Sequence, residues 1–309
     1  MVCVIGGNQL ARSVLTLAVL LQLSYFGQSA LPSCGSNPIT SPCKFAPGVH
    51  SYKSLTINTE VFLETTSSST QHFFNVSQTF DIQEGTILTL DYNKDSSSNP
   101  GTGVTGNPGS SGGSYGGRAG AASNTPLRAS QAEAYGTAFA VVQPGSSGGG
   151  SSSTRGKGGG FLKINARKLI IDGIVLANGE RAKQNSNNGG GSGGGVSINC
   201  FEIDGNGRVE ASGGMGSGKG GGGGGGRISV AFEHGSFNGE AKAYGGKTGN
   251  IQEGTFSTFY NLAYFLCVYV RVSVFFYKYV GKFRYYRYPY HVRFVLSLMK
   301  YSPPEAYIV

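Results

Sequence analysis

Apolar and polar residues alternate along three short segments in the middle of the chain, each of them reached through a run of glycines. The segments are residues 161–166, 196–200 and 227–232. Alternation with a period of two is typical of strands that bury one face and expose the other. We therefore expect a β-strand in each segment, with Ile164, Ile198 and Val230 on the buried face.

A second motif follows each segment, so that the two together form a repeat. It has the pattern Gly-x-apolar-x-Ala-x-Gly and occupies residues 173–179, 207–213 and 239–245. Ile164 returns as Ile198 after 34 residues and as Val230 after another 32. Short strands that recur at such a period bury their faces by stacking. We predict an all-β fold, a parallel β-helix or β-solenoid of glycine-rich repeats, with disordered loops and an irregular C-terminal tail.

Composition divides the chain into five regions, beginning with a signal peptide at 1–30. There, Arg12 precedes an apolar run at 14–23 that is short for a membrane span, and small residues follow it. The other regions are a strand-rich part at 31–94, a Gly/Ser/Pro-rich linker with a short ordered insert at 95–160, the solenoid repeats at 161–256, and an aromatic and basic tail at 257–309. The signal peptide predicts a secreted protein.

The tail holds most of the charge imbalance of the chain. Seven of the 25 basic residues but only one of the 16 acidic residues lie in it. The exported repeat region is therefore nearly neutral and lacks a basic footprint for nucleic acid. Three interpretations of the tail stay open: a membrane span at 259–276, an adhesive aromatic and basic segment, or a product of non-native translation. Arg271 and the alternating valines from 268 to 274 weigh against a span.

Export places the cysteines in an oxidising compartment. Cys34 and Cys43 bracket a loop of Gly, Asn, Pro and Ser, and we predict a disulfide bond between them. Cys200 stands where the other repeats carry apolar side chains, which indicates a buried thiol. Asn75 begins a glycosylation sequon, Asn-Val-Ser, and we predict a glycan on it.

Motifs for catalysis or cofactor binding are weak. Residues 213–219 match the start of a phosphate-binding loop, but Gly220 stands where Ser or Thr is required. Residues 204–207, Asp-Gly-Asn-Gly, favour a turn between strands over a calcium site. The acidic residues of the repeats are scattered and do not form the carboxylate pair of a glycosidase. We therefore predict no enzyme, no catalytic residue, no metal and no cofactor.

The glycine-rich motifs also follow a characteristic order: Gly-Gly-Ser-Tyr-Gly-Gly at 112–117, Pro-Gly-Ser-Ser-Gly-Gly-Gly at 144–150, and Gly-Gly-Gly-Gly-Arg-Ile-Ser-Val at 223–230. This order resembles a family of secreted or cell-surface glycine-rich repeat proteins over residues 80–256. The resemblance implies a parallel β-solenoid and an extracellular structural role, similar to chains of the organic matrix of cuticles, shells and skeletons. It implies no catalytic residues.

These features together predict a secreted, non-catalytic structural or interaction component of an extracellular matrix, with a biomineral or skeletal matrix as one setting. The expected partners are other matrix proteins, a polysaccharide or a mineral surface. Self-association through unpaired end strands is also expected, and a membrane is reached only through 259–276. Two alternatives stay open: a carbohydrate-binding or polysaccharide-cleaving β-helix protein, and a type I membrane-anchored surface protein.

Overall fold

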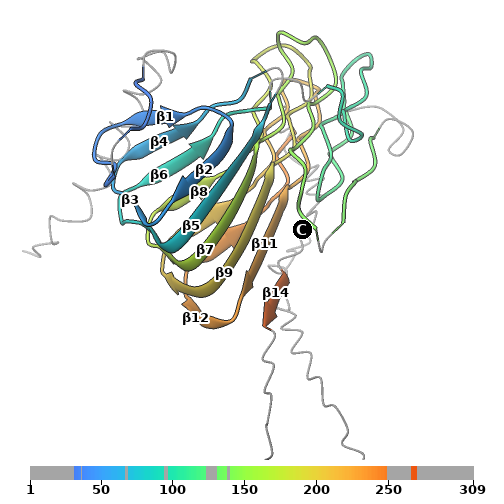
Figure 1. Ribbon diagram of the computed structural model, residues 1–309. Coiled ribbons are helices and arrows are strands. Elements are labelled where there is room, and N and C mark those ends of the chain that lie inside the picture. Colours follow the sequence, from blue (N-terminus) through green and yellow to red (C-terminus); the bar gives the residue numbers. More distant parts are fainter. Residues whose placement is uncertain are drawn as a thin grey trace, which may run out of the picture.

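The computed structural model describes residues 31–35, 37–66, 69–93, 97–122, 131–137 and 140–248, and the backbone of 266–269. These residues contain strands and no helix. The strands, shown in Figure 1, are β1 Cys43–Phe45, β2 Gly48–Tyr52, β3 Leu55–Ile57, β4 Glu60–Leu63, β5 Gln71–Ile82, β6 Ile87–Leu90, β7 Phe161–Ile171, β8 Ile174–Leu176, β9 Gly195–Gly205, β10 Arg208–Glu210, β11 Arg227–Phe232, β12 His234–Phe237, β13 Glu240–Lys242 and β14 Leu266–Tyr269.

The strands form two parallel sheets that enclose one core. The six-stranded sheet has the order β1-β4-β6-β8-β10-β13. The eight-stranded sheet has the order β14-β11-β9-β7-β5-β2, with β12 paired to β9 and β3 paired to β5. From β4 to β11 the chain alternates between the sheets, so each sheet is built from strands that are not neighbours in sequence.

Apolar side chains at alternate strand positions fill the space between the sheets. Ile164 of β7 pairs in register with Ile198 of β9, which pairs with Val230 of β11. All three side chains are buried, which confirms the predicted column. The six-stranded sheet contributes a matching buried column that includes Val61, Leu88, Val175 and Val209. Burial of an aliphatic side chain contributes about 1.5–3 kcal/mol, so these columns stabilise the pairing of successive repeats.

The predicted fold class, a parallel β-helix or β-solenoid with disordered glycine loops, was wrong. The described part of the chain consists of two extended parallel sheets without helices, and is closer to the large parallel sheets of α/β proteins than to that solenoid. The glycine-rich segments are also ordered and largely buried. The period-two pattern reports strands and register, but it carries no information on how the segments between strands pack.

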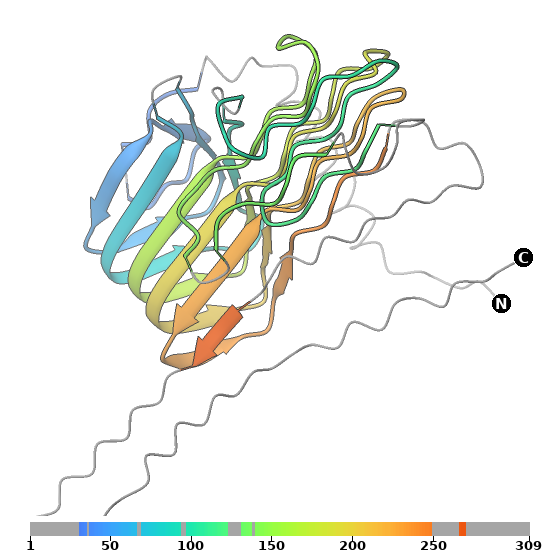
Figure 2. The ribbon, with the colours of Figure 1, turned by 90° about the vertical axis from the view of Figure 1, so that its right-hand side faces the viewer.

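Beyond one end of the sheets, the glycine-rich segments form what we call the glycine layer, which comprises residues 101–122, 145–160, 189–195, 213–226 and 243–248. Figure 2 shows these segments running side by side, next to the ends of the strands. Backbone hydrogen bonds join segments that are distant in sequence. Gly113 N–H donates to Gly190 at 2.9 Å, and Gly224 N–H donates to Gly113 at 2.8 Å. Buried backbone groups are therefore satisfied by neighbouring segments, as burial requires.

The hydrogen bonds of the glycine layer recur at every third residue. Gly190 and Gly193 donate to Gly221 and Gly224, and Gly221 and Gly224 donate in turn to Ser110 and Gly113. Three residues per turn is the period of the polyproline II helix, whose backbone makes no hydrogen bonds within its own segment. The N–H and C=O groups are thus free to bond between segments. As in collagen, glycine is required where such backbones approach each other closely.

An aromatic cluster joins the glycine layer to β11. The buried ring of Tyr115 lies 4.8 Å from the ring of Tyr135. The guanidinium of Arg227, the first residue of β11, lies 5.5 Å from the Tyr115 ring centroid. The Arg227 guanidinium also donates to the backbone carbonyl of Tyr135 at 2.8 Å. Burial raises the pKa of Tyr115 to about 12, so this phenol stays neutral beside the buried cation.

The predicted signal peptide at 1–30 lies outside the described residues. The same holds for the tail at 257–309, except for the backbone of β14, which pairs in parallel with β11. The membrane-span interpretation of 259–276 therefore falls largely outside the described part. Within that part, the chain has no helix of the length and hydrophobicity that would cross a membrane.

His72 of β5 is a fully buried histidine in the core. Its Nε2–H donates to the carbonyl of Glu64 at 2.7 Å, and its Nδ1 lies 3.3 Å from Nε2 of His50. The pKa of His72 is lowered from 6.5 to about 4, chiefly by burial; the bond to the Glu64 carbonyl opposes this shift and the nearby His50 adds to it. His72 is therefore neutral in the folded protein at neutral pH.

We predict that a methyl group in the glycine layer destabilises the fold. Gly223→Ala places a Cβ against the carbonyl of Gly191, and overpacking of this kind costs about 1–3 kcal/mol or more. Gly35→Ala is the matched control, because nothing lies within 4 Å of its added Cβ, and its effect should stay below about 1 kcal/mol. Denaturant unfolding measures both. Equal midpoints for Gly223→Ala and the unsubstituted protein would show that the layer is not close-packed.

We also predict a loss of stability in mild acid. The unfolded chain takes up a proton on His72 at a higher pH than the folded chain does. The stabilisation is therefore complete above pH 6.5 and is lost as the pH falls towards about 4. The loss amounts to about 3 kcal/mol. His72→Gln should flatten this part of the curve of unfolding free energy against pH, whereas His234→Gln, at an exposed position, should leave it unchanged. An unaltered curve in His72→Gln would contradict this assignment.

Candidate functional site

A groove of about 720 Å³ crosses the outer face of the eight-stranded sheet. It lies at a level where several strands of this face are interrupted or bulged. The chain passes from β2 to β3 and from β11 to β12 at this level, and β5 has a bulge between Val76 and Thr79. An extra residue in one strand bends it and increases its local twist. The groove is open to solvent along its length and runs across the strands.

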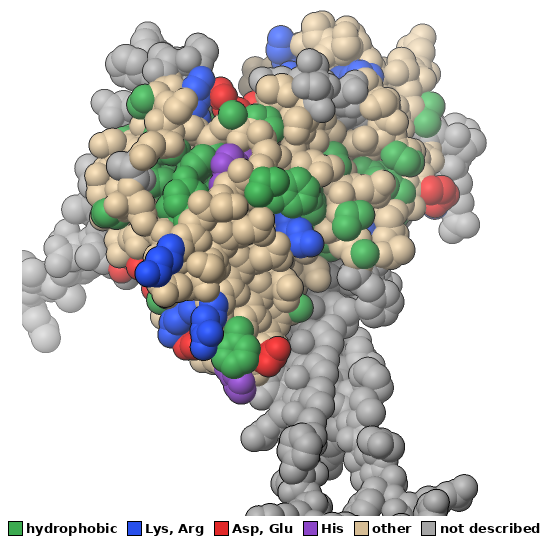
Figure 3. Space-filling view, in the orientation of Figure 1, with side chains coloured by type: hydrophobic (Ala, Val, Ile, Leu, Met, Phe, Trp, Pro, Cys, Tyr) green, Lys and Arg blue, Asp and Glu red, His purple; other side chains and the backbone are tan. Residues whose placement is uncertain are grey.

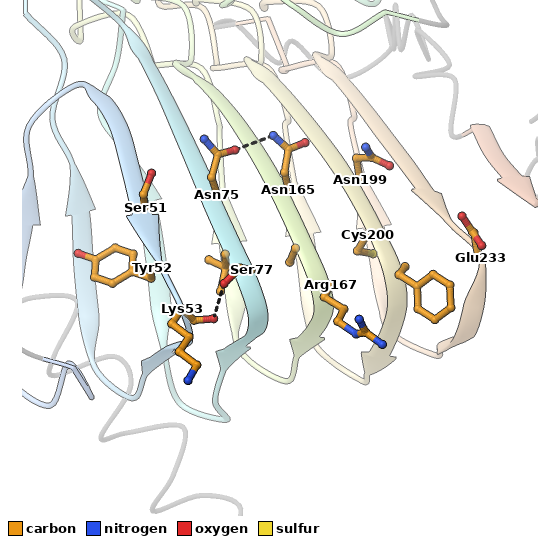
Figure 4. A pocket seen from close by; sticks show the side chains of 13 residues that line it. Ser51, Tyr52, Lys53, Asn75, Ser77, Asn165, Arg167, Asn199, Cys200 and Glu233 are labelled. Atoms are coloured by element: carbon orange, nitrogen blue, oxygen red, sulfur yellow. Dashed lines mark hydrogen bonds between the residues drawn. The ribbon is translucent and has the colours of Figure 1, made fainter.

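One side of the groove is a row of short polar side chains. Ser51, Asn75, Asn165 and Asn199 are paired in register on β2, β5, β7 and β9. Figure 4 shows them side by side, with the amide of Asn165 donating to Oδ1 of Asn75 at 2.8 Å. Neighbouring strands lie about 4.8 Å apart, so the row repeats an amide at that spacing.

The other side of the groove carries charged and aromatic side chains. The lining residues here are Lys53, Ser77, Arg167, Phe201 and Glu233. Phe201 is 43% exposed, and the Arg167 guanidinium lies 5.8 Å from its ring centroid. The ring of His234 meets Phe201 edge-on, with centroids 4.7 Å apart. Arg167 and Phe201 therefore form a stacked pair that faces solvent.

Neither Lys53 nor Arg167 has an ion-pair partner among the described residues, whereas the neighbouring Lys168 has two. Lys168 Nζ lies 2.5 Å from a carboxylate oxygen of Glu202 and 2.9 Å from one of Asp204. In Figure 3, basic side chains gather at the lower end of this face, beside an exposed hydrophobic side chain and acidic ones. Among the described residues that line the groove, two cations thus have no ion-pair partner, and Glu233 is the one carboxylate.

The groove also contains Cys200, but its thiol is unreactive. Cys200 is buried between the two polar rows, in register with Ala166. Burial raises its pKa to about 12. Since the thiolate is the reactive form of cysteine, the groove has no nucleophile here.

The predicted disulfide pair and the predicted glycosylation site lie in different parts of the structure. Cys34 and Cys43 form a disulfide bond at the start of the six-stranded sheet, with Cα atoms 5.1 Å apart. Asn75 lies in the groove, in the middle of β5, and is exposed. The structure therefore brings the sequon, and not the cysteine pair, into the candidate site.

Two motifs that the sequence does not favour as ligand sites, the turn at Asp204 and the phosphate-loop-like stretch, make structural contacts. The carboxylate of Asp204 is held by Lys168, which lowers the pKa of Asp204. Lys219, at the end of the phosphate-loop-like stretch, lies in the glycine layer, and its backbone N–H donates to Oδ1 of Asn187 at 3.0 Å. No group of three or more His, Cys, Asp or Glu in the described ranges is placed to hold a metal ion.

Sequence analysis missed most of the groove. Asn165 and Asn199 occupy equivalent positions in two successive repeats, as do Arg167 and Phe201. The recurrence of asparagine at outward positions was the signal that could have found the row. The pairing with Asn75 could not have been found, because 90 residues separate Asn75 from Asn165.

Comparison of the chain with protein-family models, with curated proteins and with solved structures found no match. The resemblance to glycine-rich repeat proteins therefore stays a prediction from motifs.

We predict that Asn75 carries an N-linked glycan when the full chain passes through a glycosylating secretory pathway, because the sequon is exposed on the open face of β5. Mass spectrometry should find a glycan that peptide N-glycosidase removes. Ser77→Ala destroys the sequon and should abolish the modification, whereas Ser51→Ala alters the groove and leaves the sequon intact. Secreted protein with an unmodified Asn75 would refute this prediction.

Proposed function

We propose that this protein is a secreted, non-catalytic structural and interaction component of an extracellular matrix. The observation that carries the proposal is the continuous network of backbone hydrogen bonds through two parallel sheets and the glycine layer. Hydrogen bonds join each strand and glycine-rich segment to its neighbours, so the outer faces present fixed, regularly spaced rows of side chains. These are properties of a framework protein.

The chemistry of the groove agrees with a binding role. Cleavage of a glycosidic bond generally uses two carboxyl groups on opposite sides of the bond. Glu233 is the single carboxylate in the lining of the groove, and the Cys200 thiol is kept protonated by burial. An open groove also leaves a reacting bond in water, whereas catalytic sites gain electrostatic strength by excluding it. Binding without turnover fits these features best.

The disulfide bond of Cys34 with Cys43 supports an extracellular location. Disulfide bonds persist in oxidising compartments and are rare where thiols are kept reduced. The bond between Cys34 and Cys43 closes a short loop close to the predicted end of the signal peptide, so the mature chain would begin with a cross-linked segment.

Fractionation of the producing tissue tests the proposal. The native protein should remain with insoluble matrix after detergent extraction and should be released by digestion or demineralisation of the matrix. Mass spectrometry of the released protein should find a new N-terminus near residue 30, and it also establishes whether residues 257–309 are present. Extraction by detergent alone would favour a membrane-anchored surface protein. Release of sugars from matrix polysaccharides by the purified protein would favour an enzyme.

A further inference from the structure

We propose that the groove on the outer face of the eight-stranded sheet binds a linear acidic polysaccharide, one that carries carboxylate or sulfate groups. The chain would lie across the strands, along the row of Asn75, Asn165 and Asn199, with its anionic groups towards Lys53 and Arg167. The inference rests on the proposed function in one respect, because it names the ligand class of a matrix interaction protein.

The amide row supplies the recognition of hydroxyl groups. Each asparagine side chain has two donor hydrogens and one acceptor oxygen, which suits sugar hydroxyls that both donate and accept. In the groove, the bond between Asn165 and Asn75 uses one donor and one acceptor and leaves the remaining donors and acceptors of the row for a ligand. Because parallel pairing fixes the amides at about 4.8 Å intervals, a polymer with regularly repeated hydroxyls meets an equivalent partner on each strand.

The uncompensated cations select for an acidic polymer. Lys53 and Arg167 line the same side of the groove and have no ion-pair partner within the described part of the chain. Lys168 close by is bound by both Glu202 and Asp204, which leaves that group with one negative charge. A guanidinium binds carboxylate and sulfate through two parallel hydrogen bonds. Glu233 lies on the β11 side of the groove, beside Phe201, and forms an ion pair with neither cation within the described part of the chain.

Phe201 contributes an apolar surface beside Arg167. Its ring is 43% exposed, although a large apolar side chain on a polar sheet face gains nothing from contact with water. The contact with Arg167 holds the guanidinium next to the ring, so that one sugar can pack against the ring edge while its acidic group reaches the guanidinium. The shape of the site also agrees, because an open groove accepts the middle of a long chain and does not require a chain end.

The test is binding of the full-length secreted protein to a fluorescent oligogalacturonate long enough to cross β2 to β9. A neutral glucose oligomer of equal length is the comparison. A glycan on Asn75 would consume its amide nitrogen and fill the groove, so the proposal concerns protein in which Asn75 is unmodified. Both oligomers are therefore measured on Ser77→Ala protein, which lacks the sequon. The acidic oligomer should bind, the neutral one should bind at least about tenfold more weakly, and the affinity should fall as the salt concentration rises.

Variants locate the site. Arg167→Gln and Lys53→Gln should each weaken binding of the acidic oligomer by about tenfold, which is the effect of losing one charge-assisted contact. Arg167→Lys should restore part of the affinity, because it keeps the charge and loses the bidentate geometry. Arg181→Gln removes the same charge from an exposed position in another part of the chain and should have no effect. Unchanged thermal unfolding of each variant shows that the fold is intact.

The inference is overturned by absence of binding, by equal affinity for the acidic and neutral oligomers, or by binding that Arg167→Gln and Lys53→Gln do not alter. In those cases, retention of the protein in insoluble matrix would still support the proposed function. Cleavage of the oligogalacturonate, lost in Arg167→Gln, would support the site and overturn the non-catalytic function.

Discussion

The structure depends on parallel, in-register pairing of backbones that come from distant parts of the chain. In the strands this pairing places like side chains in columns, such as Ile164, Ile198 and Val230. In the glycine layer it places carbonyl oxygens where side chains would otherwise lie. A one-residue change of register in one repeat would therefore move apolar side chains to the outer face. In the glycine layer it would shift the carbonyls out of the positions that glycine leaves free. The sheets and the glycine layer thus both require a fixed register, the sheets through apolar side chains and the glycine layer through carbonyl oxygens.

A turn next to the glycine layer explains how repeats of unequal length stay in register. The interval from Ile164 to Ile198 is two residues longer than that from Ile198 to Val230. Both pairs are nevertheless directly opposite in the sheet, and so are Arg208 with Ile174 and with Glu240. The difference is absorbed in the turn at 183–188: Ala182 N–H donates to Met215, 33 residues on, whereas Gly190 N–H donates to Gly221, 31 residues on.

The strands and the glycine layer differ in how far they could be predicted from the sequence. Strand positions and the column of Ile164 followed from alternation and period, because burial of one face leaves a local signal. The packing of the glycine-rich segments did not follow, since glycine tracts in disordered chains and in close-packed backbones have the same composition. No groove was predicted: the sequence singled out Asn75 as a glycosylation site and Cys200 as a buried thiol. Most of the other lining residues occupy outward positions, where the recurrence of asparagine at 165 and 199 was the one available signal.

The cysteine pair bears on how such a body could assemble. An exposed edge strand offers unpaired backbone groups to another chain. At the start of the six-stranded sheet, however, Lys44 of β1 exchanges hydrogen bonds with Pro32 and Cys34, and the disulfide of Cys34 with Cys43 ties this segment to the strand. The first edge is thus already occupied by the chain itself. Association by strand addition is therefore disfavoured at this end, which leaves the outer faces, such as the one with the groove, as surfaces for contact with other molecules.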